Sequence, residues 1–365
     1  MRSFLACLLL CTCTCLAQSD PRTGKILEWG WGTPPPIVVQ KHITEMEKLP
    51  FDGLVMNLYA NGHHDPSTRP DRQAAFTHLC FYSRPIKPEN YTESINALKN
   101  THFKRFTDNF LLFDVTPGHH DWFDDFSAVY FNARFLARTA KQTGIKGIVL
   151  DTETYDGEVF NYPRLPQHNQ HTLAEYRKQV RLRGREFMRA INMEYPDIKI
   201  LVSLAYSMAH GDDGPNNTKY GLLPDFLDGM NEAASPQTVL YDGWEYSYNY
   251  TTEKEFVDVR KIIRETTPNE WSAVPEKVKE HWRASFGLWI DYGEDAKWNQ
   301  QDFSKNFFSP QQFSYSLHQA LCHTDRYVWI YSHHANWWQG QVPQPYLDAL
   351  TNARHLEVMP SAPSK

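Results

Sequence analysis

Short hydrophobic runs alternate along the chain with longer segments in which apolar residues recur at helical spacing. The runs are Ile26–Gly30, Gly53–Tyr59, Phe110–Val115, Gly147–Asp151, Ile198–Ala205, Val239–Asp242, Ser285–Asp291 and Tyr327–Tyr331. The clearest helical segments are Val38–Lys48, Ala128–Thr143, Leu173–Met193, Glu253–Glu265, Pro310–Leu321 and, after the last run, Pro345–Arg354. Eight strands, each followed by a helix, close a parallel barrel, so the pattern predicts an α/β fold of the (β/α)8 TIM-barrel type in a single domain.

An open, doubly wound sheet is the alternative reading of the same alternation. Such a sheet normally carries a glycine-rich phosphate-binding turn after its first strand. Here Gly30-Trp31-Gly32 runs into three prolines instead. The chain also contains no internal repeat and no linker that would divide it. These features favour the closed barrel.

The barrel predicts a particular order of side chains within each strand, because successive residues of a strand point to opposite faces. Four runs have one face made of large aliphatic or aromatic residues, which we expect to meet the surrounding helices. The opposite faces, expected to line the barrel, are Gly53/Val55/Asn57/Tyr59, Gly147/Val149/Asp151/Glu153, Ser285/Gly287/Trp289/Asp291 and Tyr327/Trp329/Tyr331/His333. Polar groups on this inner face fall at the carboxyl ends of the strands, where barrel enzymes build their sites.

The first residues have the layout of a secretory signal. Arg2 precedes an apolar run, Phe4–Leu10, and a small-residue exit ends at Ala17. We therefore expect residues 1–17 to be a signal peptide, residues 18–365 to form the catalytic barrel, and the mature protein to be secreted or periplasmic. A lipoprotein signal is the alternative, because Cys11, Cys13 and Cys15 lie in this segment. No later stretch is apolar enough to predict a membrane span.

The amino-acid composition indicates which classes of partner the protein can bind. The formal net charge is −6 and no basic run is present, which argues against nucleic acid as a partner. No cofactor is expected. The 11 Trp, 19 Tyr and 21 Phe offer aromatic faces that suit sugar rings, so the partner that we expect is a carbohydrate. Beyond the signal only Cys80 and Cys322 remain, and their places in the predicted barrel argue against a disulfide between them.

Asp151 and Glu153 are the first candidates for chemistry. They continue the inner face of an otherwise apolar strand, where burial and mutual repulsion should raise the pKa of at least one of them. A carboxyl group with a raised pKa can act as a general acid near neutral pH. The competing reading is structural, with Asp151 capping the loop and Glu153 in solvent.

Breaking a glycosidic bond requires a proton donor and a second carboxylate. Asp291 at the end of the seventh run and Glu245 after the sixth are the candidates for this second group, because both strands face the fourth across the barrel mouth. Parity favours Asp291, and aromatic neighbours favour Glu245. The sequence does not choose between them.

Histidine pairs follow three of the predicted strands, at His63-His64, His119-His120 and His333-His334. Histidines that converge from several loops can bind a metal, which would make the protein a metal-dependent hydrolase or deacetylase. Adjacent histidines point apart, however, and no H-x-H motif lies on the first strand. We therefore expect no metal, and a role in binding sugar hydroxyls for some of these side chains.

The residues expected to bind substrate are polar or aromatic and lie at or just beyond strand ends. They are Asn57, Asp114, His120, Tyr206, Tyr241, Asp242, Trp244, Trp289, Tyr331, His333 and Trp337.

The segment Gly147-Ile-Val-Leu-Asp151-Thr-Glu153 resembles the fourth-strand D-G-x-D-x-D-x-E signature of the family 18 chitinase-like glycoside hydrolases. In that family the final Glu donates the proton and the Asp two residues before it orients a substrate acetamide. Tyr241-Asp242 is similar to the family's sixth-strand Tyr-Asp pair, and Trp329 to Tyr331 sits where its last strand supplies an aromatic floor. Lys146 and Val149 stand where the first two Asp of the signature occur.

Together these features predict a secreted glycoside hydrolase that acts on a poly- or oligosaccharide, with Glu153 as general acid/base and Asp151 tuning it or orienting an acetamide. A barrel that binds carbohydrate without catalysis is the remaining alternative to this reaction and to the metal-dependent one.

Overall fold

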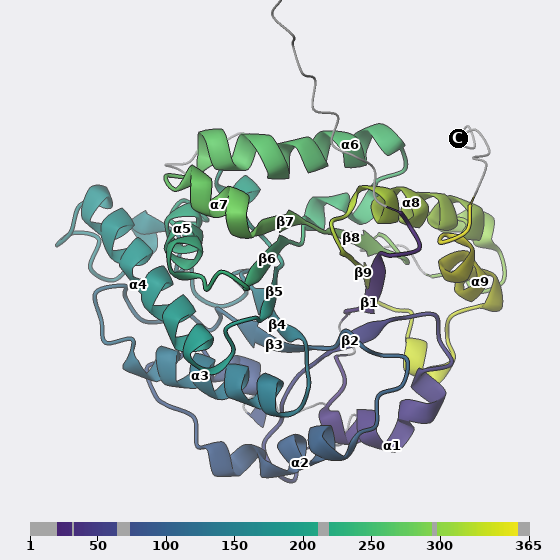
Figure 1. The fold of residues 1–365 in the computed structure, drawn as a ribbon, viewed down its shortest axis with the longest axis horizontal. Coiled ribbons are helices and arrows are strands. Elements are labelled where there is room, and N and C mark those ends of the chain that lie inside the picture. Colours follow the sequence, from purple (N-terminus) through teal and green to yellow (C-terminus); the bar gives the residue numbers. More distant parts are fainter. Residues whose placement is uncertain (1–19, 31–32, 64–73, 211–218, 294–297, 357–365) are drawn as a thin grey trace, which may run out of the picture.

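The computed structural model describes residues 20–30, 33–63, 74–210, 219–293 and 298–356. The predicted signal peptide lies outside the described residues. One parallel sheet runs in the order β7-β6-β5-β4-β3-β2-β1-β9-β8 and forms a ring that helices surround (Figure 1). Its strands are β1 Lys25–Glu28, β2 Gly53–Met56, β3 Phe110–Asp114, β4 Gly147–Asp151, β5 Lys199–Val202, β6 Val239–Asp242, β7 Trp282–Ala284, β8 Phe286–Trp289 and β9 Tyr327–Tyr331.

The ring closes where β7 and β8 follow each other directly. β7 pairs with β6, β8 pairs with β9, and only Ser285 separates the two strands. The backbone N–H of Ser285 donates to the carbonyl of Asp242 at 2.9 Å, so pairing continues through the break. The two short strands therefore share the seventh of eight barrel positions. This arrangement confirms the predicted TIM barrel and rules out the open sheet.

The six predicted helical segments form helices with ends shifted by a few residues, and α2, α5 and α7 are added to them. They are α1 Pro36–Met46, α2 Thr92–Asn100, α3 Ser127–Gln142, α4 Leu173–Glu194, α5 Leu223–Ala233, α6 Glu253–Lys261, α7 Pro275–His281, α8 Pro310–His323 and α9 Gln344–Asn352. Capping boxes begin α4 at Thr172, α6 at Thr252 and α8 at Ser309, because each hydroxyl meets the backbone N–H of a Glu or Gln three residues on. Among the described residues no helix is long and apolar enough to cross a membrane.

One predicted helix changes from an α-helix to a π-helix along its length. The segment expected as Glu253–Glu265 is α-helical only to Lys261 and continues as a π-helix over Ile262–Trp271, with Pro268 inside it. Proline has no N–H to donate and crowds the preceding turn of an α-helix. The wider π-helical turns accommodate it.

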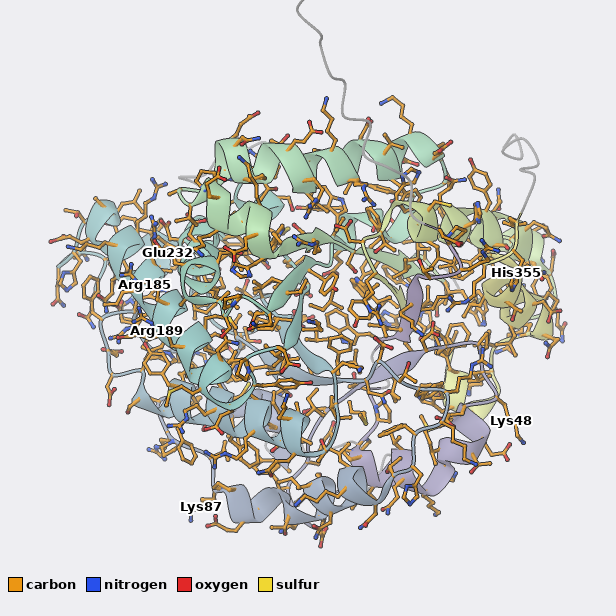
Figure 2. The ribbon with its side chains drawn as sticks, viewed as in Figure 1. Lys48, Lys87, Arg185, Arg189, Glu232 and His355 are labelled. Atoms are coloured by element: carbon orange, nitrogen blue, oxygen red, sulfur yellow. The ribbon has the colours of Figure 1, made fainter. Side chains whose placement is uncertain are left out.

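Side chains divide into the two sets that parity predicts. The residues packed inside the barrel include Leu27, Val55, Val149, Tyr327 and Trp329. The alternate residues pack in the layer between strands and helices, for example Leu54, Met56, Ile148, Leu150, Phe286, Leu288, Val328 and Ile330. Figure 2 shows side chains filling both the ring and this outer layer. The inner set is a solid core, so any site must lie above it at the mouth.

The helices α4 and α5 approach closely because each has a glycine at the contact. A Cβ atom on Gly184 would lie 2.1 Å from the carbonyl oxygen of Phe226, and one on Gly229 would lie 2.0 Å from that of Arg181. At the edge of the contact Arg185 reaches Glu232 at 3.2 Å (Figure 2). This packing fixes the helices beside β5 and β6.

Candidate active site

Carboxyl groups gather at the mouth from two adjacent strands and from the turn after a third. Asp114 and Asp151 are the last residues of β3 and β4 and stand opposite each other in the strand register. Glu153 follows two residues later and is half-buried, and Glu245 begins the 3-10 helix η6, Glu245–Asn249, directly after β6. Parallel strands present their carboxyl ends at one edge of the sheet, which brings these four groups to the same face.

Asp151 is the most firmly held of the four. Its Oδ1 accepts hydrogen bonds from the Ser203 hydroxyl at 2.8 Å and from the backbone N–H of Glu153 at 3.0 Å. Its side chain is buried, and burial raises its pKa to about 6, with the charge of Glu153 adding to the effect. The hydrogen bonds act in the opposite direction. The raised pKa expected for one member of this pair is therefore present on Asp151.

The pKa of Asp114 is raised as well. Burial, and then the negative charges of Asp151 and Glu153, raise its pKa well above the usual value. Its Oδ1 has no hydrogen-bond partner among the described residues. Below it, the thiol of Cys80 donates to the Asp114 carbonyl oxygen at 3.1 Å. Asp114 thus stands beside Asp151 as a second carboxyl group with a raised pKa.

Glu245, in the turn after β6, lies within electrostatic reach of the carboxyl groups that follow β4. Burial, followed by the charges of Glu153 and Asp151, raises its pKa to about 8. The hydroxyl of Tyr248, one helical turn later, donates to it and opposes that shift. Glu245 is consequently protonated at neutral pH while it lies within electrostatic reach of Glu153.

The turn that carries Glu245 is held by the neighbouring strand. Trp244 adopts φ 39°, in the left-handed region, and turns the chain sharply after β6. The hydroxyl of Ser247 donates to the carbonyl of Gly287 on β8 at 2.8 Å and accepts from the Gly287 N–H at 3.1 Å. These bonds fix the start of η6, and with it the Glu245 backbone, against β8.

Two tyrosines that sequence reasoning did not select belong to this cluster. The hydroxyl of Tyr155 lies 3.4 Å from Asp151 Oδ2, although its ring is largely exposed. Desolvation of this hydroxyl, and then the charges of Asp151 and Glu153, raise the pKa of Tyr155. The second tyrosine is Tyr248. The sequence contained the signals that would have selected both tyrosines. Tyr155 continues the alternation from Asp151 and Glu153, and Tyr248 lies one turn of η6 after Glu245.

An aromatic wall borders Glu245 on the β8–β9 side. Tyr248 stacks on Tyr331 with ring centroids 5.3 Å apart, and Trp289 meets both rings edge-on. The imidazole of His333 stacks on the far face of this group, 6.1 Å from Trp289. Trp289, Tyr331 and His333 were predicted substrate residues, and the structure brings them together.

Asp291 does not join the carboxyl cluster. Its two oxygens accept hydrogen bonds from the backbone N–H groups of His333, His334 and Ala335 and from the Trp289 indole, at 2.6–2.9 Å. A carboxylate with four donors is fully occupied by its own protein. The structure therefore gives Asp291 the task of anchoring the loop after β9, and leaves Glu245 as the group that faces Glu153.

Three of the predicted substrate residues point away from the mouth. Tyr241 packs inside the barrel against Tyr327, 4.8 Å away, so the next residue, Asp242, points outward. Trp244 is buried in the outer layer, and its indole N–H donates to Tyr250. The hydroxyl of Tyr206 donates to Asp228 on α5. The predictions for Asp242, Trp244 and Tyr206 relied on strand-end position alone and were wrong. Successive side chains point to opposite faces, and these three point toward the surrounding helices.

The other predicted residues have structural contacts of their own. His120 packs between Phe81 and Phe126, and burial lowers its pKa to about 4. Asn57 donates to the hydroxyl of Thr77 at 3.0 Å. Trp337 packs edge-on against Phe51, 4.8 Å away. Tyr241 lies too deep in the inner core to reach the mouth.

The metal-dependent alternative relied on converging histidines. In the described ranges no group of three or more His, Cys, Asp or Glu side chains is arranged to hold a metal ion. His119 lies 3.3 Å from Asp156, the rings of His333 and His334 are tilted against each other with centroids 4.4 Å apart, and His64 falls outside the described residues. Cys80 and Cys322 are both buried, free thiols.

No protein-family model and no curated protein matches this sequence. Solved structures of similar architecture include a glycoside hydrolase family 5 enzyme from Prevotella bryantii B14, with TM-score 0.49 and 12% identity over 92% of this chain and 96% of that one. A GH18 chitinase from Pseudoalteromonas aurantia has TM-score 0.42 and 11% identity over 86% and 97%. A 3-keto-D-glucoside 4-epimerase from E. coli has TM-score 0.42 and 14% identity over 91% and 99%. With TM-scores below 0.5, and with an epimerase beside the hydrolases, these likenesses assign no reaction to the chain.

Proposed function

We propose that this protein is a glycoside hydrolase that cleaves an oligo- or polysaccharide with Glu153 and Glu245 as its carboxyl pair. The observation that carries the proposal is the approach of these two carboxyl groups at the barrel mouth. Glu245 is held protonated by burial, and the negative charge of Glu153 contributes to its raised pKa. Glycosidic cleavage needs one protonated and one ionised carboxyl on either side of the scissile bond.

The roles follow from the raised pKa of Glu245. Glu245 donates the proton to the leaving oxygen, because a buried acid with a pKa of about 8 still carries its proton at neutral pH. Glu153 acts as nucleophile or as base for water. The sequence alone favoured Glu153 as the proton donor. The raised pKa of Glu245 supports Glu245 as the proton donor instead. Asp151 binds the backbone N–H of Glu153 and so positions it.

The aromatic wall supports a carbohydrate as the substrate. Tyr248, Tyr331 and Trp289 present ring faces and edges next to Glu245, and aromatic rings pack against the C–H faces of sugars while polar groups bind the hydroxyls. Secretion remains part of the proposal, because a hydrolase of polymeric sugars meets its substrate outside the cell.

The test uses the wild-type chain with Glu153→Gln, Glu245→Gln and, as a matched control, Glu186→Gln on the outer helix α4. A panel of soluble polysaccharides and aryl glycosides identifies a substrate for the wild type. Each cluster variant should reduce turnover of natural glycosides by about 10²–10⁴-fold, and the α4 control should not. Aryl glycosides whose leaving group needs no proton should restore activity to Glu245→Gln only. Equal activity of all variants would refute the proposal.

A further inference from the structure

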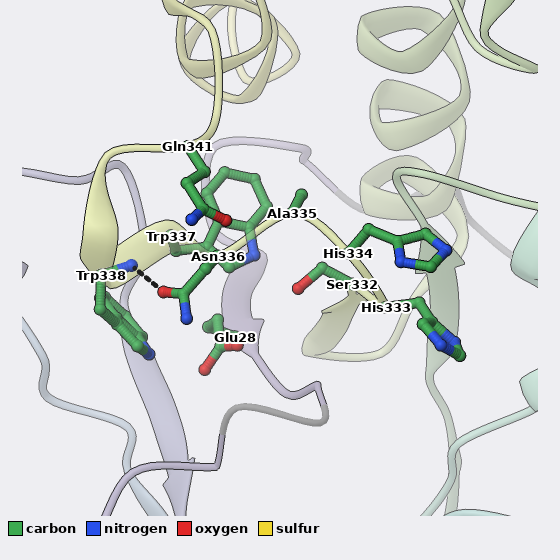
Figure 3. A pocket seen from close by; sticks show the side chains of 9 residues that line it. All are labelled: Glu28, Ser332, His333, His334, Ala335, Asn336, Trp337, Trp338 and Gln341. Atoms are coloured by element: carbon green, nitrogen blue, oxygen red, sulfur yellow. Dashed lines mark hydrogen bonds between the residues drawn. The ribbon is translucent and has the colours of Figure 1, made fainter. Parts of the chain in front are cut away.

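A polar pocket opens beyond the carboxyl ends of β1 and β9, apart from the carboxyl cluster. Its volume is about 150 Å³. Its lining residues are Glu28, Ser332, His333, His334, Ala335, Asn336, Trp337, Trp338 and Gln341 (Figure 3). Nothing in the proposed reaction uses this space.

Glu28 is the unusual member of the lining. It ends β1, its side chain is 2% exposed, and its Oε2 has no hydrogen-bond partner among the described residues. Burial raises its pKa to about 8. A buried polar group without a partner destabilises a folded protein unless a ligand satisfies it. In Figure 3 this carboxyl group borders the open space of the pocket.

The opposite side of the pocket is rich in donors. Asn336 uses its Oδ1 to accept from the N–H groups of Trp338 and Gln339, at the start of the 3-10 helix η9, Trp337–Gln339, which leaves its Nδ2 as a donor. The indole N–H groups of Trp337 and Trp338 are buried and have no partner in the described part of the chain. The hydroxyl of Ser332 adds a group that can both donate and accept.

This chemistry selects the kind of ligand. The N–H donors on one side would repel an ammonium group. Glu28 on the other side, which keeps its proton at neutral pH because burial raises its pKa to about 8, can both donate and accept, so the two sides offer donors and acceptors without a negative charge. A neutral ring with several hydroxyl groups satisfies both sides, because each hydroxyl donates and accepts. A pocket of about 150 Å³ has room for one such ring.

We propose that this pocket binds one uncharged glycosyl ring and is a remote subsite for the saccharide that is cleaved at Glu153 and Glu245. The choice of ligand class rests on the proposed function. The pocket is connected to the cluster through side chains already described, since His333 stacks on Trp289 and Trp289 contacts Tyr248, which binds Glu245. The same loop after β9 carries His333 and the pocket.

The test measures binding of D-glucose, D-mannose, D-xylose and N-acetyl-D-glucosamine to the full chain by ligand-observed NMR. Trp338→Phe removes one indole donor and keeps a ring, and Glu28→Met replaces the carboxyl by an apolar group of similar size. Trp298→Phe is the control, because the indole N–H of Trp298 also has no partner among the described residues, but its ring packs on Tyr346 outside the pocket. At least one sugar should bind, and each pocket variant should weaken it about tenfold. The control should bind as the wild type does.

The variants separate a binding role from a structural one. Glu28→Met should unfold at the same or a higher urea concentration than the wild type, because it removes an unsatisfied buried carboxyl. Unchanged sugar affinity in Trp338→Phe, or no binding of any of the four sugars, would overturn the subsite. If the sugar binds and Trp338→Phe weakens it, but no glycoside is hydrolysed, the proposed function fails and the pocket stands as a sugar site. If hydrolysis depends on Glu153 and Glu245 and the pocket variants bind normally, only the pocket proposal fails.

Discussion

The hydroxyl of Ser203, one residue beyond β5, donates to Asp151 at the end of β4 across 2.8 Å. This bond stabilises the ionised form of Asp151, which burial disfavours. Ser203→Ala should therefore raise the pKa of Asp151 further, by about one unit for a charged hydrogen bond. NMR titration of the Asp151 carboxyl carbon measures the shift. Ser235→Ala, remote from the mouth, is the control, and an unchanged Asp151 pKa would contradict the assignment of this bond.

The pH dependence of turnover should follow Glu245. As proton donor with a pKa of about 8, it loses its proton as the pH rises through that value, so kcat/KM should decline above about pH 8. Steady-state rates between pH 5 and pH 10 give the alkaline limb. In Glu245→Gln the residual activity on activated aryl glycosides should not show this decline. A limb that persists unchanged in the variant would assign it to another group.

Stability should also fall as the pH rises. Asp151, Glu245 and Glu28 have folded-state pKa values of about 6, 8 and 8, above their usual values of 3.8–4.5. The folded state therefore binds more protons than the unfolded state, and the stabilisation from these groups is complete below about pH 4 and lost as the pH passes through 6 to 8. Urea unfolding at pH 5.5 and pH 8.5 measures the difference. Glu28→Gln should reduce this slope, and a midpoint that rises with pH would contradict the assignment.

Asp291 should behave as a structural residue. Asp291→Asn places an amide N–H₂ against a loop that offers only N–H donors, and should lower the free energy of unfolding by about 2–4 kcal/mol. The control is Asp302→Asn. Asp302 caps the exposed 3-10 helix η8, Phe303–Lys305, and an asparagine can replace an aspartate at such a position with little change in stability. Urea titrations of both variants make the comparison. Wild-type stability with turnover reduced by orders of magnitude would instead make Asp291 the second catalytic carboxylate.

The contact between α4 and α5 depends on the absence of a side chain at Gly184. Gly184→Ala should destabilise the protein by about 1–3 kcal/mol, because the new methyl group meets the carbonyl oxygen of Phe226 and cannot be accommodated without moving a helix. Met193→Ala, at an exposed position of the same helix, should change stability by less than about 0.5 kcal/mol. Equal midpoints for the two variants would show that the helices separate easily.

The strands that were easiest to predict are those with uninterrupted apolar alternation. The runs Gly147–Asp151, Val239–Asp242 and Tyr327–Tyr331 coincide with β4, β6 and β9. The seventh barrel strand begins at Trp282, three residues before its predicted start. Arg283 interrupts the apolar pattern there, so the sequence did not indicate a strand over Trp282–Ala284. The break at Ser285 arises from pairing with two different neighbours, and no local sequence feature signals such a tertiary effect.

For the site, alternation was informative for the strand ends, but it could not show the contacts that each side chain makes. It placed Asp151 and Trp289 on the inner face, where they lie beside Asp114 and Tyr331. After β6 the alternation continues, with Trp244 turned outward and Glu245 at the mouth, although Trp244 adopts a left-handed conformation that the sequence does not signal. Asp291 lies on the correct face, but the backbone donors that occupy it come from residues 333–335, more than forty positions away.

The break at Ser285 also bears on the geometry of the carboxyl pair. Glu153 is built on the β3–β5 side of the ring, through Asp151 and Ser203. Glu245 follows β6 in sequence, but Ser247 ties its turn to Gly287 on β8, beyond the break. Glu153 thus depends on contacts before the break, and Glu245 on contacts that reach across it. In the proposed hydrolase the separation of these two groups distinguishes retention from inversion, so the bonds between Ser247 and Gly287 help to set the stereochemical outcome.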